Sequence, residues 1–83
     1  MDERELKLLI EEEDKRIRRL RILVELITAL IAQDDSITLD DAWAHVKALK
    51  QAAENLFPGK GDVFDLIYLP RFSRLVAERF GAN

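Results

Sequence analysis

The chain has 83 residues and a mass of 9.6 kDa, a size that allows one domain and no more. With 48% hydrophobic residues, 35% charged residues and a net charge of −3, its composition is that of a folded protein rather than a disordered one. The absence of cysteine excludes disulfides, thiolate nucleophiles and cysteine-based metal sites, and the single histidine, His45, leaves no imidazole pair for a metal. We therefore expect no cofactor and no enzymatic activity.

The N-terminal residues 1–5 are too acidic for the first part of a signal peptide, and no apolar stretch follows them directly. The most apolar window, residues 20–32, contains Arg21 and Glu25 and is shorter than the roughly 20 apolar residues that span a bilayer. We expect a cytoplasmic protein without a membrane partner.

Residues 2–33 predict one long helix, because they contain no glycine or proline and consist mainly of strong helix formers. Asp2 is expected to cap its first turn. Apolar residues recur every seven positions along it, at two core positions of a heptad. One position holds Ile10, Ile17, Val24 and Ile31, and the other holds Leu6, Glu13, Leu20 and Ile27. This pattern predicts a coiled-coil seam with one acidic interruption, Glu13.

The second half of this helix has a wider apolar surface than the seam alone. The additional apolar residues are Ile22, Leu23, Leu26, Ala29 and Leu30. A helix that is apolar on most sides has to be covered on most sides, so we expect the rest of the chain to wrap this half. The first half should project, since two helices of about 27 Å cannot flank one of about 45 Å from end to end.

Residues 39–56 predict a second, amphipathic helix with apolar residues three and four positions apart. Thr38 and Asp41 have the spacing of a capping box, and Ile37 is placed to act as a hydrophobic staple. Residues 57–61 contain proline and glycine and should end this helix, and Asp62 is expected to cap the next one.

Residues 63–80 predict a third helix with a broad aromatic and aliphatic face, interrupted at Pro70. Proline lacks a backbone donor and clashes with the preceding turn, so we expect a kink, or a short helix followed by another with Pro70 in its first turn. Gly81 is a plausible C-cap. The predicted fold is all-α, with one domain over residues 1–83 built around the second half of the first helix.

Charge is distributed in blocks along the first helix. Residues 1–14 hold seven acids and two bases, whereas residues 15–21 hold five bases and no acid. Two such helices packed antiparallel about the junction of these blocks would bring acids next to bases, and a parallel pair would bury Glu13 against its own copy. We therefore expect an antiparallel homodimer. The predicted interface comprises Leu6, Ile10, Glu13, Ile17 and Leu20.

The basic run also allows a second interpretation, in which it contacts nucleic acid phosphates. Its members are Lys15, Arg16, Arg18, Arg19 and Arg21. Acids precede it at the spacing that favours intrahelical ion pairs, namely Glu11 with Lys15, Glu12 with Arg16 and Asp14 with Arg18. We therefore favour a solvated, ion-paired helix, and treat nucleic acid binding as the alternative.

The remaining motifs have ordinary structural interpretations. The acidic residues 34–41 lack the glycine and glutamate of a calcium loop and are better explained as helix caps. Residues 59–61 lack the other elements of a phosphate-binding loop, and His45 has Asp41 as its nearest acidic neighbour on the helix but no nucleophile motif nearby. Aromatic residues and arginines alternate in the last segment, where helical spacing favours aromatic packing in the core.

Taken together, these observations predict a non-catalytic interaction or assembly module that acts as a homodimer through its first helix, and that could also bind another protein. The alternative is a small nucleic-acid-associated protein that uses residues 15–21. No part of the sequence identifies a family.

Overall fold

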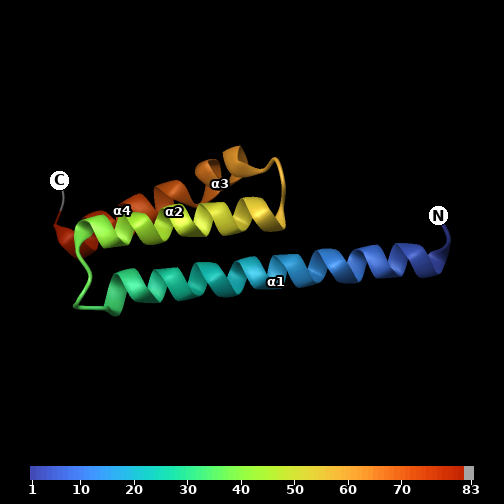
Figure 1. Ribbon diagram of the computed structural model, residues 1–83, viewed down its shortest axis with the longest axis horizontal. Helices are drawn as coiled ribbons and strands as arrows, with labels where there is room; N and C mark the ends of the chain where they lie inside the picture. Colours follow the sequence, from blue (N-terminus) through green and yellow to red (C-terminus); the bar gives the residue numbers. More distant parts are fainter. Residues whose placement is uncertain (82–83) are drawn as a thin grey trace.

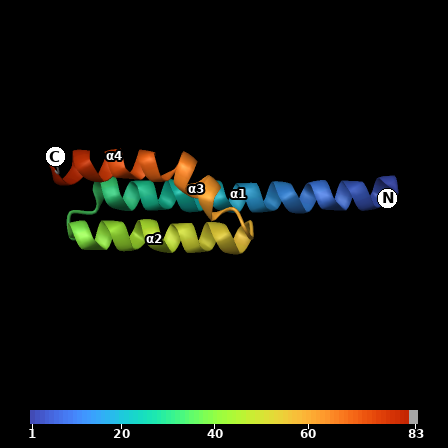
Figure 2. The same cartoon turned by 90° about the horizontal axis from the view of Figure 1, so that it is seen from above.

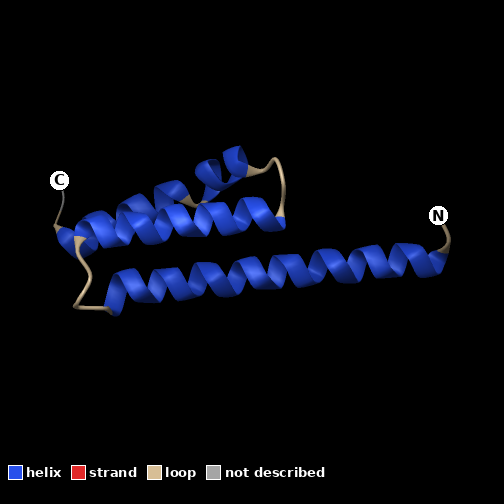
Figure 3. Ribbon diagram, viewed as in Figure 1, coloured by secondary structure: helices blue, strands red, loops and turns tan. Residues whose placement is uncertain are grey.

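The structure is a computed structural model that describes residues 1–81, and these residues form four helices and no strand. The helices are α1 (Glu3–Gln33), α2 (Leu39–Leu56), α3 (Gly61–Ile67) and α4 (Leu69–Phe80). The prediction of an all-α fold is confirmed (Figure 3). α1 and α2 form an antiparallel pair, and α3 and α4 pack across it to complete a short bundle (Figures 1 and 2).

Local signals in the sequence determine several helix ends. The Asp2 side chain accepts a hydrogen bond of 2.8 Å from the Glu5 amide and caps α1, as expected. The capping box at the start of α2 is confirmed, because the Thr38 hydroxyl and the Asp41 carboxylate each accept a hydrogen bond from the other residue's amide. Gly81 ends α4 with a φ of 64°, a left-handed conformation that glycine adopts at low cost.

The start of α3 differs from the prediction. The helix begins at Gly61 with Lys60 as its N-cap residue, and no side chain caps it, so the expected cap by Asp62 is wrong. Asp65 instead accepts a 2.9 Å hydrogen bond from Lys50 and ties α3 to α2. A Cβ at Gly61 would meet the carboxylate end of the Glu54 side chain on α2, which would have to move aside.

Pro70 lies in the first turn of α4, where its missing N–H would have no helical acceptor. Tyr68 separates α3 from α4 and serves as the cap residue of both. Its amide donates to the Phe64 carbonyl and its carbonyl accepts from the Phe72 amide. The two short helices therefore follow one another with a single intervening residue.

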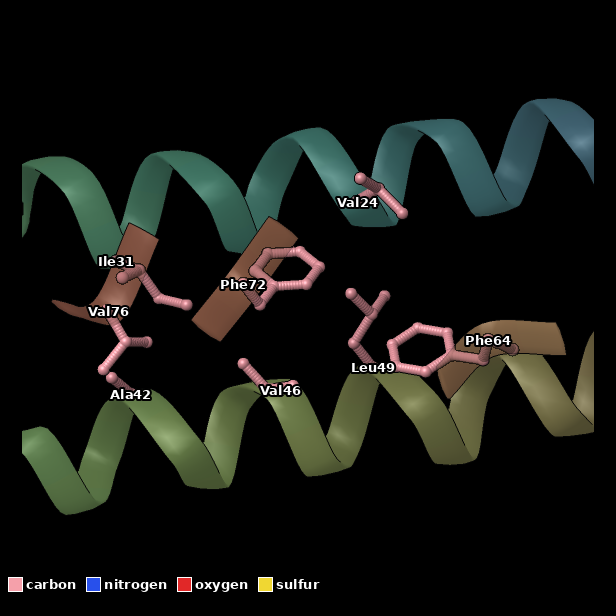
Figure 4. Close-up of a cluster of buried hydrophobic side chains, with 9 residues drawn as sticks. Val24, Ile31, Ala42, Val46, Leu49, Phe64, Phe72 and Val76 are labelled. Carbon is pink, nitrogen blue, oxygen red and sulfur yellow. The ribbon is translucent and has the colours of Figure 1, made fainter. Parts of the chain in front are cut away.

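The core lies between α1, α2 and the α3–α4 segment. Its buried residues are Val24, Ile31, Ala42, Val46, Leu49, Ala53, Phe64, Phe72 and Val76 (Figure 4). On α1 the buried residues begin at Val24, so the core covers only the second half of that helix. Leu20 packs against the edge of the core and is half-buried.

Arg79 closes the end of the bundle at which α1 ends. Its guanidinium donates a hydrogen bond of 3.3 Å to the Asp34 carbonyl and lies 3.8 Å from the Asp35 carboxylate. The carbonyl belongs to the C-cap residue of α1, where the helix dipole favours a positive charge. α4 is thereby fastened to the α1–α2 connection.

No helix within residues 1–81 is long and apolar enough to cross a membrane. The first half of α1 extends past the other helices, so the molecule measures 54 × 22 × 16 Å (Figure 1).

Candidate interaction surface on the first helix

The seam predicted on the first half of α1 is exposed in the protomer. Leu6 is 50% exposed, Ile10 53% and Ile17 43%, whereas Leu20 is half-buried at the edge of the core. Every residue from position 1 to 15 is exposed. Of the residues predicted for the dimer interface, the structure therefore leaves all but Leu20 without substantial cover from their own chain. We call Leu6, Ile10, Glu13 and Ile17 the free seam.

The free seam lies on the same face of α1 as the core. Ile17, Val24 and Ile31 follow one another at intervals of seven residues, and the last two are buried. Positions seven apart on an α-helix differ by only about 20° in direction. The core face therefore continues along α1 beyond the point at which α2 and α3 stop covering it. Figures 1 and 2 show from two sides that α1 extends past these helices.

The end of this cover is a small cavity of about 160 Å³ between α1, the end of α2 and the start of α3. Its lining residues are Leu20, Ala53, Phe57, Lys60, Val63, Phe64 and Tyr68. Val63 is 45% exposed at this point. The end of any helix that lay along the free seam would reach the end of α2 and the start of α3.

The ion pairs around the free seam differ from those predicted. Arg16 pairs with Glu13 at 3.1 Å, three residues away, instead of with Glu12. Within residues 1–81, none of the three predicted four-residue pairs comes within 4 Å. Glu13 thus has a cationic partner in its own chain, so a carboxylate at a seam position is not left uncompensated.

The structure places the five residues of the basic run around α1 rather than on one side. Helical geometry puts Arg16 and Arg21 beside the free seam, and Lys15, Arg18 and Arg19 on the opposite side. Arg16 is half-buried and the other four are exposed. No other ion pair involving this run occurs in the described part of the chain. The three predicted four-residue ion pairs are therefore wrong, whereas the expected exposure to solvent holds for all but Arg16.

A second exposed apolar region lies on the second half of α1 and corrects another expectation. Ile22 is 56% exposed and Leu26 51% exposed, so this half is not wrapped on most sides. α2 and α4 cover two sides of it and leave the third open. A shallow groove of about 370 Å³ runs between this side and α2. Its lining residues are Arg19, Ile22, Leu23, Ala52, Asn55 and Leu56. The wide apolar surface predicted for the second half of α1 indicated this region. Only the position of α4 in the fold shows that this side of α1 stays uncovered.

The other candidate groups have structural roles. Asp34 accepts hydrogen bonds from the Ser36 hydroxyl at 2.6 Å and the Ser36 amide at 2.9 Å. These bonds, with smaller contributions from the charges of His45 and Arg79, lower the pKa of Asp34 from 3.8. Within residues 1–81 no three acidic or histidine side chains form a group that could hold a metal ion.

The alternating aromatic and basic residues of the last segment form contacts within the fold. Arg71 lies over the Tyr68 ring at 5.6 Å from its centroid, and Arg79 lies over the Phe80 ring at 4.9 Å. The rings of Phe64 and Tyr68 pack with their centroids 5.4 Å apart and their planes tilted by 36°. Phe64 and Phe72 are buried in the core, and Tyr68 and Phe80 pack against it.

Comparison of the chain with protein-family models, with curated proteins and with solved structures finds no match.

Proposed function

We propose that this protein is a non-catalytic assembly module that forms an antiparallel homodimer through the free seam of α1. The observation that carries the proposal is the exposure of three large aliphatic side chains on a helix face that is buried elsewhere along the same helix. An apolar helix stripe of this kind is stabilised when another helix covers it. The proposal places the module in the cytoplasm, to which a chain without cysteine is suited.

A second copy of the chain fits the free seam because its charges are complementary. The acidic block of residues 1–14 and the basic block of residues 15–21 both lie on the exposed part of α1. An antiparallel partner can bring the basic block of each copy next to the acidic first turns of the other, whereas a parallel partner in register brings like charges together. Two acids of these first turns, Glu3 and Glu5, have no ion-pair partner within the described protomer and are available for this purpose.

Light scattering coupled to size-exclusion chromatography at tens of micromolar tests the proposal. We expect a mass of twice 9.6 kDa. Replacement of Glu3 and Glu5 together by lysine should weaken the dimer, because it places cations next to the partner's basic block. A particle of 9.6 kDa would overturn the proposal, and an unchanged dimer in the lysine variant would exclude α1 as the interface.

Nucleic acid binding through Lys15, Arg16, Arg18, Arg19 and Arg21 is a second candidate function. The observation that favours it is that only Arg16 of these five has an ion-pair partner in the described part of the chain. Binding driven by phosphate contacts weakens steeply with salt, so titrations of duplex and single-stranded oligonucleotides at two salt concentrations test it. Absence of binding at the lower salt concentration would exclude this function.

A further inference from the structure

We propose that the homodimer has one defined register, in which the two α1 helices cross between residues 11 and 12 and Leu6 of each copy packs opposite the partner's Ile17. This inference rests on the proposed homodimer and adds the position at which the copies meet. It differs from a crossing at the junction of the charge blocks, between residues 14 and 15, which the sequence alone favoured.

The heptad pattern restricts the choice of register. In an antiparallel pair, a residue at one core position packs against a residue at the other core position of the partner. Leu6 can therefore lie opposite the partner's Ile10, Ile17 or Val24. Each step between these choices shifts one helix by seven residues, about 10.5 Å.

Burial excludes the register in which Leu6 lies opposite the partner's Val24. Val24 is only 8% exposed, because α2 and the α3–α4 segment already cover it. A partner helix cannot occupy that volume unless the bundle opens. The register in which Leu6 lies opposite the partner's Ile10 avoids this clash, but it leaves Ile17 of each copy uncovered at 43% exposure.

Charges beside the seam favour the same register. With Leu6 opposite Ile17, the residues that flank the core position on one side bring Lys7 next to the partner's Asp14, twice in the dimer. The register shifted toward Ile10 brings Lys7 next to its own copy. The register shifted toward Val24 brings Asp14 next to its own copy. Only the intermediate register has attractive pairs on this side.

The end of the bundle also limits how far the partner's α1 can extend along the free seam. In this register the partner's Glu3 lies opposite Leu20, which lines the 160 Å³ cavity at the end of α2 and the start of α3. Lys60 lines that cavity, and Arg21 follows Leu20 on α1, so two cations lie near the place at which the partner's acidic first turn arrives. The free parts of the two helices, residues 3–19, then overlap along their whole length.

Glu13 is accommodated in this arrangement. It lies opposite the partner's Ile10, so its methylene groups extend the apolar layer. Its carboxylate stays paired with Arg16 of its own chain at 3.1 Å, at the edge of the seam. The acidic interruption therefore needs no buried counter-charge from the partner.

Cysteine cross-linking tests the register, since the natural chain contains no cysteine. Disulfides need Cα atoms roughly 4.4–6.8 Å apart. We expect an equimolar mixture of the Leu6→Cys and Ile17→Cys variants to shift to a cross-linked dimer on mild oxidation, while each variant alone stays uncross-linked. In the proposed register, the two copies of position 6 are separated by eleven residues, about 16 Å along the helices. Both positions are exposed in the protomer, so neither substitution removes a buried side chain.

Two controls separate the possible outcomes. A mixture of Glu13→Cys and Ile17→Cys cross-links only if the helices cross near residue 15, and that result would overturn the register while leaving the dimer intact. Cross-linking of Leu6→Cys alone would indicate a parallel dimer and would also overturn it. A light-scattering mass of one chain for the unmodified protein would instead overturn the proposed function itself.

Discussion

Replacement of Ile10 by alanine should weaken the dimer without destabilising the protomer. The change removes three side-chain carbons. Full burial of each contributes about 0.8 kcal/mol of hydrophobic free energy, or about 2.4 kcal/mol in total. Because Ile10 is 53% exposed in the protomer, about 1.3 kcal/mol of this is left to be gained at the interface. Each dimer contains the substitution twice, so the loss is about 2.5 kcal/mol, or about 70-fold in the dissociation constant Kd.

The matched control for this experiment is Leu8→Ala. Leu8 is 57% exposed, and the substitution also removes three carbons. It lies about 160° around α1 from Ile10 and faces away from the seam. Sedimentation equilibrium measures Kd for both variants, and circular dichroism checks that α1 is retained, since alanine favours helix at both positions. Equal Kd values for the two variants would refute the assignment of the interface to the seam face.

Three further predictions concern charge, packing and pH. Lys7→Glu should raise the Kd of the dimer by a few-fold to about tenfold through two lost pairs and new repulsion, and Asp14→Lys in the same chain should restore it; no restoration would contradict the pairing. Ile31→Ala should lower the free energy of unfolding by about 2–5 kcal/mol in urea titrations, because Ile31 is 0% exposed; a change below about 1 kcal/mol would show that this side chain is not part of a packed core. The lowered pKa of Asp34, caused mainly by the Ser36 hydrogen bonds, stabilises the fold above the ordinary value of 3.8, and this contribution is lost as the pH falls through the lower folded-state pKa. Asp34→Asn should therefore reduce the loss of thermal stability between neutral and acidic pH, and an unchanged pH dependence would argue against this contribution.

Features that depend on neighbours in the sequence were predicted well. The all-α fold follows from the helical spacing of apolar residues and from the proline and glycine that separate the helices. The caps by Asp2, Thr38 and Gly81 follow from local backbone chemistry and are confirmed. Such features need no knowledge of which helices pack together.

Features that depend on tertiary packing were predicted less well. The sequence offers Asp62 as the cap of the third helix, but no side chain caps α3, and only the position of Lys50 on the neighbouring helix shows that Asp65 links α2 and α3. The apolar width of α1 indicated burial at Ile22 and Leu26, but the three other helices are too few to cover that side. Helix charge spacing favoured Arg16 with Glu12, whereas the side chain lies toward Glu13.

The exposure of the free seam could be predicted because it depends on the difference in length between the first helix and the helices that pack against it. A 31-residue helix is about 46 Å long, and α2 has 18 residues, or about 27 Å. The register that we propose could not be inferred in the same way. It requires the position at which α2 and α3 stop covering α1, and Leu20 marks that position only once the bundle is assembled.

Arg79 holds the end of α4 beside the α1–α2 connection, and this position determines where the end of α4 would lie in a dimer. Because α4 ends beside the α1–α2 connection, its last residue is at the opposite end of the 54 Å axis from the start of α1 (Figure 1). Two copies that overlap only along residues 3–19, about 26 Å, form a rod of about 80 Å with one α4 end at each extremity. Attachments at these two ends would be held apart at a fixed distance, so the dimer would act as a rigid spacer between them.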